Sequence, residues 1–125
     1  MGKTYTIDIQ KALSFPHTVN QMADGDKRCA VGAIFSAIEW DTPITSDYCQ
    51  SEETGKWMSD NLLSPYLISV TRINDIHCQS DLERDLLRRR VIMDLIQSGL
   101  LVPAATDRTL AQELKELVKQ PCTIQ

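Results

Sequence analysis

Cys29 is the residue of this sequence best suited to covalent chemistry. It follows the basic pair Lys27 and Arg28 and precedes an almost wholly apolar stretch, AVGAIFSAI, at 30–38. A thiol in the first turn of a helix lies near aligned amide dipoles, which favour the thiolate, and adjacent basic charges add to that effect. Free cysteines are also among the residues most often buried as small apolar side chains. Cys29 is therefore either a reactive thiol or a small residue where a buried helix enters the core, and we favour the second interpretation.

A nucleophilic cysteine needs a base, and the sequence offers His17 and His77. His17 lies in the loop ahead of Cys29, whereas His77 follows Asp75, whose carboxylate could orient the imidazole ring. A cysteine hydrolase or transferase that uses Cys29, His77 and Asp75, or His17 as the base, is therefore one hypothesis. The Asn74-Asp75 pair also has a structural explanation, because both side chains bind local backbone and form turns between elements.

The same residue types are zinc ligands, so His77, Cys78, Cys29 and Cys49 have the right atoms for a tetrahedral site. Structural zinc sites usually take their ligands in close pairs, and the cysteines of this chain form no C-x-x-C motif. The adjacent His77 and Cys78 also point apart in most backbone conformations. We therefore expect no metal and no cofactor. Because the N-terminus lacks a secretory signal, we expect reduced thiols and a cytoplasmic location.

Arg88, Arg89 and Arg90 form a basic triplet, which raises the hypothesis of a nucleic-acid-associated regulator. The overall charge argues against that partner, because the chain has a net charge of −4 and a pI of about 5.1. Between residues 81 and 94, four acids offset four arginines. Asp85 precedes Arg89 by four residues, the favoured order for an ion pair on a helix. We therefore expect a solvated, self-paired helix face and consider nucleic acid an improbable partner.

Two helices are expected in the N-terminal part of the chain, and Cys29 lies at the start of the second. Residues 6–15 have helical apolar spacing, with Thr6 as the N-cap and Pro16 at the end. The following helix, which starts next to Cys29, is apolar on nearly every side, as is typical of the centre of a bundle. Gly32 costs about 1 kcal/mol relative to alanine inside a helix. We therefore expect another backbone segment to approach Gly32 closely.

The strongest helical signal covers residues 81–98. Ser80 and Glu83 form a capping box ahead of it, and Gly99 ends it. Its apolar residues form two nearly opposite stripes: Leu82, Leu86, Met93 and Ile96 on one side, and Leu87, Val91 and Leu95 on the other. The helix is therefore expected to pack on two sides, or to pack on one side and offer the other to a partner. A last amphipathic helix is predicted at about 107–119.

The remaining segments complete a mainly α fold. Residues 41–50 resemble an irregular surface connection, and a third helix is predicted from Ser51. Residues 66–73 are either helical, which we favour, or one short strand. The sequence therefore predicts a compact single domain over 1–125, built as a bundle of five or six helices.

Two stretches, ADGDKRCAVGAIFSA (23–37) and ISVTRINDIHCQSDLERDLL (68–87), resemble a pattern in small uncharacterised proteins of bacteria, especially actinobacteria, and their phages. The residues that carry the pattern are Asp24, Cys29, Gly32, Asn74 and Asp75. This chain departs from the pattern at Ile73, where the family usually has tryptophan, and 41–65 has no counterpart. The resemblance implies a core in which the helix that starts at Cys29 meets an Asn-Asp turn. It implies a bacterial or phage source and no particular activity.

We expect a non-enzymatic module that binds another protein, such as a phage or mobile-element accessory factor that inhibits a host or defence protein. The acidic charge, the weak catalytic set and the doubly apolar helix at 81–98 favour this function, and the same helix could form a homodimer. Aromatic and arginine side chains often anchor interfaces, and the candidates are Trp40, Tyr48, Trp57, Tyr66, Arg88 and Arg89. No stretch approaches the ~18–20 apolar residues of a membrane span, so we expect no membrane contact and a location in the cytoplasm, that of the host for a phage protein.

Overall fold

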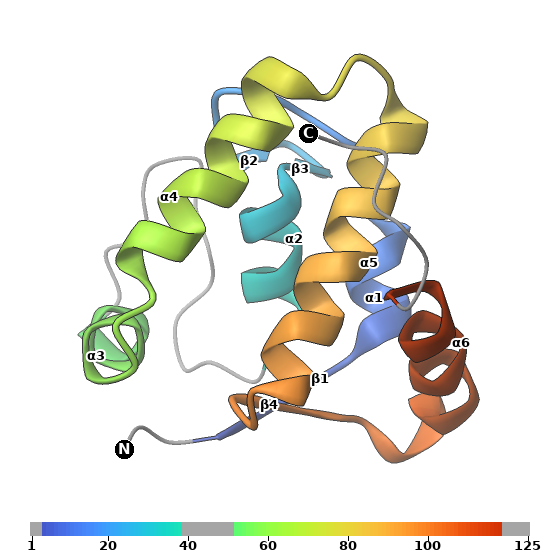
Figure 1. Cartoon of the computed structure of the whole chain (residues 1–125). Helices are drawn as coiled ribbons and strands as arrows, with labels where there is room; N and C mark the ends of the chain where they lie inside the picture. Colours follow the sequence, from blue (N-terminus) through green and yellow to red (C-terminus); the bar gives the residue numbers. More distant parts are fainter. Residues whose placement is uncertain (1–3, 39–51, 119–125) are drawn as a thin grey trace.

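The computed structural model describes residues 4–38 and 52–118, and this part of the chain is mainly α-helical, as predicted (Figure 1). The helices are α1 (Ile9–Ser14), α2 (Ala30–Ser36), α3 (Glu52–Asp60), α4 (Ser64–Arg72), α5 (Asp81–Gln97) and α6 (Arg108–Val118), with a π-helical segment η1 (Ile73–His77) and a 3-10 turn η2 (Ala105–Asp107). The strands are β1 (Tyr5–Ile7), β2 (Ala23–Asp24), β3 (Lys27–Arg28) and β4 (Leu101–Pro103). Within these two ranges, no helix has the length and apolar character needed to cross a membrane.

The N-terminal segment corrects one prediction. The helix expected at 6–15 with Thr6 as its N-cap is shorter, and Thr6 lies instead in strand β1, which pairs in parallel with β4 near the other end of the chain. Helix α1 begins after Asp8, whose carboxylate accepts a hydrogen bond from the Lys11 amide at 3.0 Å. Tyr5 and Ile7 are both buried, the alternation of a strand. The β1–β4 pairing is invisible locally because its two strands are distant in sequence.

Helix α2 occupies the centre of the fold, between α4 and α5 and against α1 (Figure 1). All residues from Ala30 to Phe35 are buried, which confirms the prediction of a central helix without a polar face. The rings of Phe35 and of Trp57 from α3 pack in a T-shaped arrangement, with their centroids 6.0 Å apart. The short hairpin of β2 and β3 leads directly into the start of α2.

Helix α4 settles the ambiguity at 66–73 in favour of helix, so the alternative of a short strand is wrong. The predicted Asn74-Asp75 turn is also wrong, because both residues continue α4 as η1 before the chain turns at Cys78. The hydrogen bonds of a π segment span five residues instead of the four of an α-helix, and so short a segment could not be distinguished from the apolar spacing of the sequence. This extension brings Asn74 inward against the start of α2.

Helix α5 follows the sequence prediction closely. The Ser80 hydroxyl accepts a hydrogen bond from the Glu83 amide at 3.2 Å, and the Glu83 carboxylate accepts one from the Gln79 amide at 2.8 Å. Gly99 has a positive φ of 79° just beyond the end of the helix. The helix contacts α2 and α6, so it packs on two sides, although Leu82 at its start is 71% exposed.

Candidate functional site

Cys29 is the N-cap of α2 and is buried, with 2% of its surface exposed. Its Sγ accepts a hydrogen bond from the backbone N–H of Gly32 at 3.3 Å. Burial raises the pKa of the Cys29 thiol, and the N–H groups of Gly32 and Val31 only partly oppose that shift. The thiol is therefore held in its neutral form at neutral pH, contrary to what a thiolate nucleophile requires.

Gly32 allows the loop before the hairpin to lie directly on α2. A Cβ atom at this position would stand 2.0 Å from the carbonyl oxygen of Met22. The same oxygen accepts a hydrogen bond from the Cys29 amide at 3.4 Å. The predicted close approach of another backbone to Gly32 is thus confirmed, and the approaching segment is the loop around Met22.

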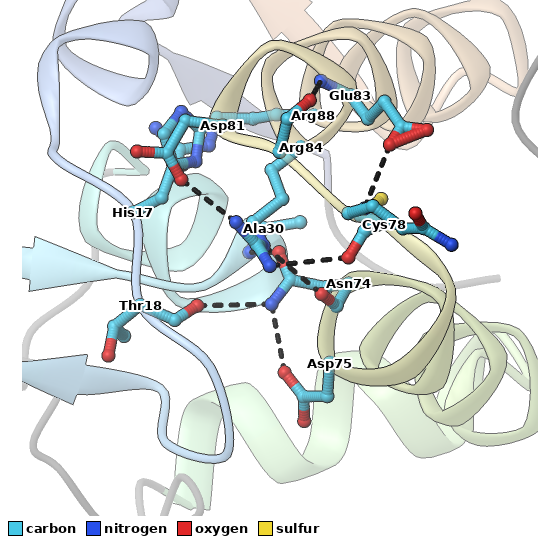
Figure 2. A network of polar contacts seen from close by, with 12 residues as sticks. His17, Thr18, Ala30, Asn74, Asp75, Cys78, Asp81, Glu83, Arg84 and Arg88 are labelled. Atoms are coloured by element: carbon cyan, nitrogen blue, oxygen red, sulfur yellow. Dashed lines mark hydrogen bonds and ion pairs between the residues drawn. The ribbon is translucent and has the colours of Figure 1, made fainter.

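Asn74 links η1 to three other segments of the chain: the loop at 16–28, α2 and α5 (Figure 2). The side chain is fully buried, and its amide nitrogen donates to the Thr18 carbonyl at 3.1 Å and to the Asp75 carboxylate at 2.8 Å. Its side-chain oxygen accepts from the Ala30 amide at 3.4 Å, in the first turn of α2. The Asn74 carbonyl in turn accepts from the Arg84 guanidinium at 3.3 Å. The Asn-Asp pair therefore joins η1 to the loop, to α2 and to α5.

The predicted solvated face of three arginines is wrong at Arg88, because its side chain is fully buried. It donates to the backbone carbonyls of Ala12 at 3.0 Å, Phe15 at 2.8 Å and Arg28 at 3.1 Å. It also contacts Nδ1 of His17 at 3.0 Å. Burial lowers the pKa of Arg88 to about 10, so the guanidinium remains charged at neutral pH.

The burial of Arg88 divides the basic triplet. Arg89 forms the predicted ion pair with Asp85, with 2.7 Å between Nε and Oδ2. Arg88 lies on the helix side of Ile92 and Leu95, both buried, so it cannot contribute to a basic surface. A nucleic-acid interface that needs all three arginines at the surface is not what this helix presents.

A cleft of about 340 Å³ lies beside Cys29, where the loop at 20–22 faces α2 and α4. It is lined mainly by apolar side chains and by five polar or charged residues at 20, 21, 71, 72 and 75. The apolar part comprises Met22, Val31, Phe35, Met58, Leu67 and Ile68. Asn20 has a φ of 66°, a left-handed conformation that asparagine tolerates better than most residues. This cleft is the candidate functional site. It could not be predicted from the sequence, because its walls come from separate segments.

The proposed catalytic group is only partly brought together. Cys29 and Asp75 line the same cleft, but neither His17 nor His77 belongs to its lining. His77 is exposed on η1, and the Nδ1 of His17 is occupied by Arg88. In the part of the chain that the structure describes, Cys29 therefore shares the cleft with the carboxylate of Asp75 but with no imidazole.

The aromatic residues predicted to anchor a partner lie in different environments. Trp57 is 2% exposed and packs against Tyr5 and Phe35, so the prediction that it anchors a partner at the surface is wrong. Tyr66 is half-buried, and its hydroxyl donates to the Asp94 carboxylate at 2.9 Å. Burial, followed by the charge of Asp94, raises the pKa of Tyr66. The candidates Trp40 and Tyr48, the connection at 41–50 and Cys49 lie outside the described residues.

No protein-family model, curated protein or solved structure matches this chain. Within 4–38 and 52–118, no three His, Cys, Asp or Glu side chains lie close enough together to hold a metal ion. The site combines a buried neutral thiol, an apolar cleft and a loop that buried polar side chains attach to the helices.

Proposed function

We propose that the protein is a non-enzymatic module that binds another protein, and that the cleft beside Cys29 receives an apolar side chain of the partner. The cleft volume of about 340 Å³ carries the proposal. It falls within the range of pockets that bind ligands, roughly 300–1,000 Å³, and a mostly apolar lining with a few polar groups is typical of such sites.

The outer surface of α4 and η1 supports the same function. Ile68 lines the cleft and is 54% exposed, and Ile76 on η1 is 65% exposed. Arg72, which also lines the cleft, lies one helical turn from each of them. Exposed apolar side chains beside a cleft fit a surface that a partner covers. Arg72 and Asp75 would supply polar contacts of either sign at the edge of that surface.

The other two functions are less well supported. A cysteine enzyme would need a thiolate and a base. Burial keeps the Cys29 thiol neutral, and among the described residues that line the cleft there is no imidazole. A nucleic-acid regulator would need a basic surface, whereas Arg88 is buried and Arg89 is paired with Asp85. The resemblance to bacterial and phage proteins supports a bacterial or phage source only. The finer proposal, a cytoplasmic accessory factor that inhibits a host or defence protein, depends on the acidic charge and the weak catalytic set.

Site-directed photo-crosslinking tests the proposal. A photoreactive phenylalanine analogue replaces Ile68 in one variant and Leu82 in a control, because both residues are exposed and helical. We expect one discrete adduct from position 68 in the native host lysate, and none of the same mass from position 82. Adducts of the same mass from both positions, or from position 82 alone, would contradict the proposed site and favour a partner or second copy on α5.

A further inference from the structure

Arg88 fastens both ends of the loop that forms one wall of the cleft. At the N-terminal end of this loop, residues 16–28, it donates to the Phe15 carbonyl at 2.8 Å and meets His17 Nδ1 at 3.0 Å. At the C-terminal end it donates to the Arg28 carbonyl at 3.1 Å. The two ends also bind each other, because the Thr18 amide donates to the Arg28 carbonyl at 3.0 Å. One buried guanidinium therefore holds the loop closed against α5.

The contact between Arg88 and His17 requires a neutral imidazole. A guanidinium group carries only donors, so Nδ1 of His17 must be the acceptor and the proton of the ring must be on Nε2. A protonated imidazole has no acceptor atom, and its charge would stand 3.0 Å from a buried positive charge. Protonation of His17 thus removes its hydrogen bond with Arg88 and introduces a repulsion between the two positive charges.

Charged groups of α5 act on the pKa of His17 in both directions. Two carboxylates of α5 act on it, but Asp81 forms an ion pair with Arg84 at 2.9 Å and Asp85 forms one with Arg89. The positive charge of Arg84 lowers the pKa of His17, as that of Arg88 does. Arg28 meets His17 through an isolated bridge of the backbone, whereas its guanidinium binds the Ser36 hydroxyl and the Gly25 carbonyl. Burial is the main cause that lowers the pKa of His17, and Arg88 is the second.

We propose that the His17–Arg88 contact is a pH-sensitive latch on the cleft, which opens when His17 is protonated in mildly acidic solution. The loop that it fastens supplies Asn20, Gln21 and Met22 to the cleft lining. It also places the Met22 carbonyl on Gly32. Opening of the latch loosens this wall and weakens binding, so the regulation rests on the proposed function of the cleft.

Amide hydrogen exchange of the free protein tests the latch without any partner. The probes are the Thr18, Arg28 and Cys29 amides, which bind the Arg28, Pro16 and Met22 carbonyls. Exchange is measured at about pH 7.5 and about pH 5 and divided by the intrinsic rate at each pH. We expect protection of these amides to fall on the order of tenfold or more at the lower pH, while core amides of α5 change less.

Two variants distinguish the latch from general acid sensitivity. His17→Asn keeps an acceptor oxygen for Arg88 and cannot titrate, so its loop protection should not depend on pH. His77→Asn removes the exposed histidine and should behave as the unmodified chain does. If His17→Asn fails to fold, the NMR titration of His17 in the unmodified chain decides, since the loop amide shifts must follow that titration.

The proposal is overturned if loop protection in the unmodified chain is independent of pH, or if the pH effect persists in His17→Asn or disappears in His77→Asn. A failure of the cleft function gives a different pattern. In that case the loop amides respond to His17 as described, but crosslinking from position 68 gives no adduct at either pH.

Discussion

Replacement of Gly32 by alanine tests the packing at the start of α2 most sharply. The new Cβ would stand 2.0 Å from the Met22 carbonyl oxygen, whereas ordinary contact begins at 3.4 Å. The obstacle is backbone and must therefore retreat by about 1.4 Å, the difference between these two distances. That movement strains the 3.4 Å hydrogen bond from the Cys29 amide and displaces the loop at 20–22.

The expected magnitude follows from three contributions. Overpacking a well-packed site costs about 1–3 kcal/mol, and loss of the Cys29–Met22 hydrogen bond adds about 1 kcal/mol. The higher helix propensity of alanine offsets about 1 kcal/mol of this cost. We therefore expect Gly32→Ala to lower the free energy of unfolding by about 1–3 kcal/mol.

Urea unfolding followed by circular dichroism measures this effect, and Gly55→Ala is the matched control. Gly55 is also helical, and a Cβ there meets nothing within 4 Å. The control should be neutral or more stable by up to about 1 kcal/mol. If Gly32→Ala is as stable as Gly55→Ala, the close approach of Met22 to α2 does not exist and the cleft wall is misplaced.

Three further predictions concern the buried polar groups. Arg88→Met should lower the free energy of unfolding by about 3 kcal/mol or more, because three carbonyls and an imidazole lose their donor. The control variant Arg89→Met loses only a partly exposed ion pair and should lower it by about 1 kcal/mol or less. Denaturant titrations of both variants check this. Cys29 should react with iodoacetamide at neutral pH more slowly than an unfolded peptide thiol, as followed by mass spectrometry, and a faster reaction would contradict its burial. Folding lowers the pKa of His17 from 6.5, so the unfolded chain binds more protons than the folded chain as the pH falls below about 6.5. The contribution of His17 to the free energy of unfolding is therefore fully present above about pH 6.5 and decreases as the pH falls. Thermal unfolding at a series of pH values measures this decrease, which should be less steep in His17→Asn.

The helices were predictable where their signals are local. The capping residues Ser80 and Glu83 and the terminal Gly99 identified α5 because these groups act within one turn of the helix ends. Gly32 was informative for a similar reason, since a glycine in an otherwise apolar helix needs a packing explanation. Another backbone segment does lie against Gly32, as predicted, but only the structure identifies it as Met22.

The features that sequence reasoning missed depend on distant segments. Strand β1 has no strand-like neighbour in sequence, and its pairing with β4 becomes evident only after the chain folds. Burial of Arg88 had a weak signal, because it shares a helix side with Ile92 and Leu95. Charge suggested a surface residue, yet carbonyls from α1 and the loop satisfy its donors in the interior.

The affinity of the crosslinked partner for two charge variants tests the central claim most directly. Ile68→Glu places a carboxylate in the cleft lining, and Leu82→Glu places one on an exposed helix surface at the start of α5, outside the cleft. Isothermal titration calorimetry should give a Kd at least about tenfold weaker for Ile68→Glu and unchanged for Leu82→Glu, as loss of one anchor predicts. An unchanged Kd for Ile68→Glu would contradict the cleft as the binding site.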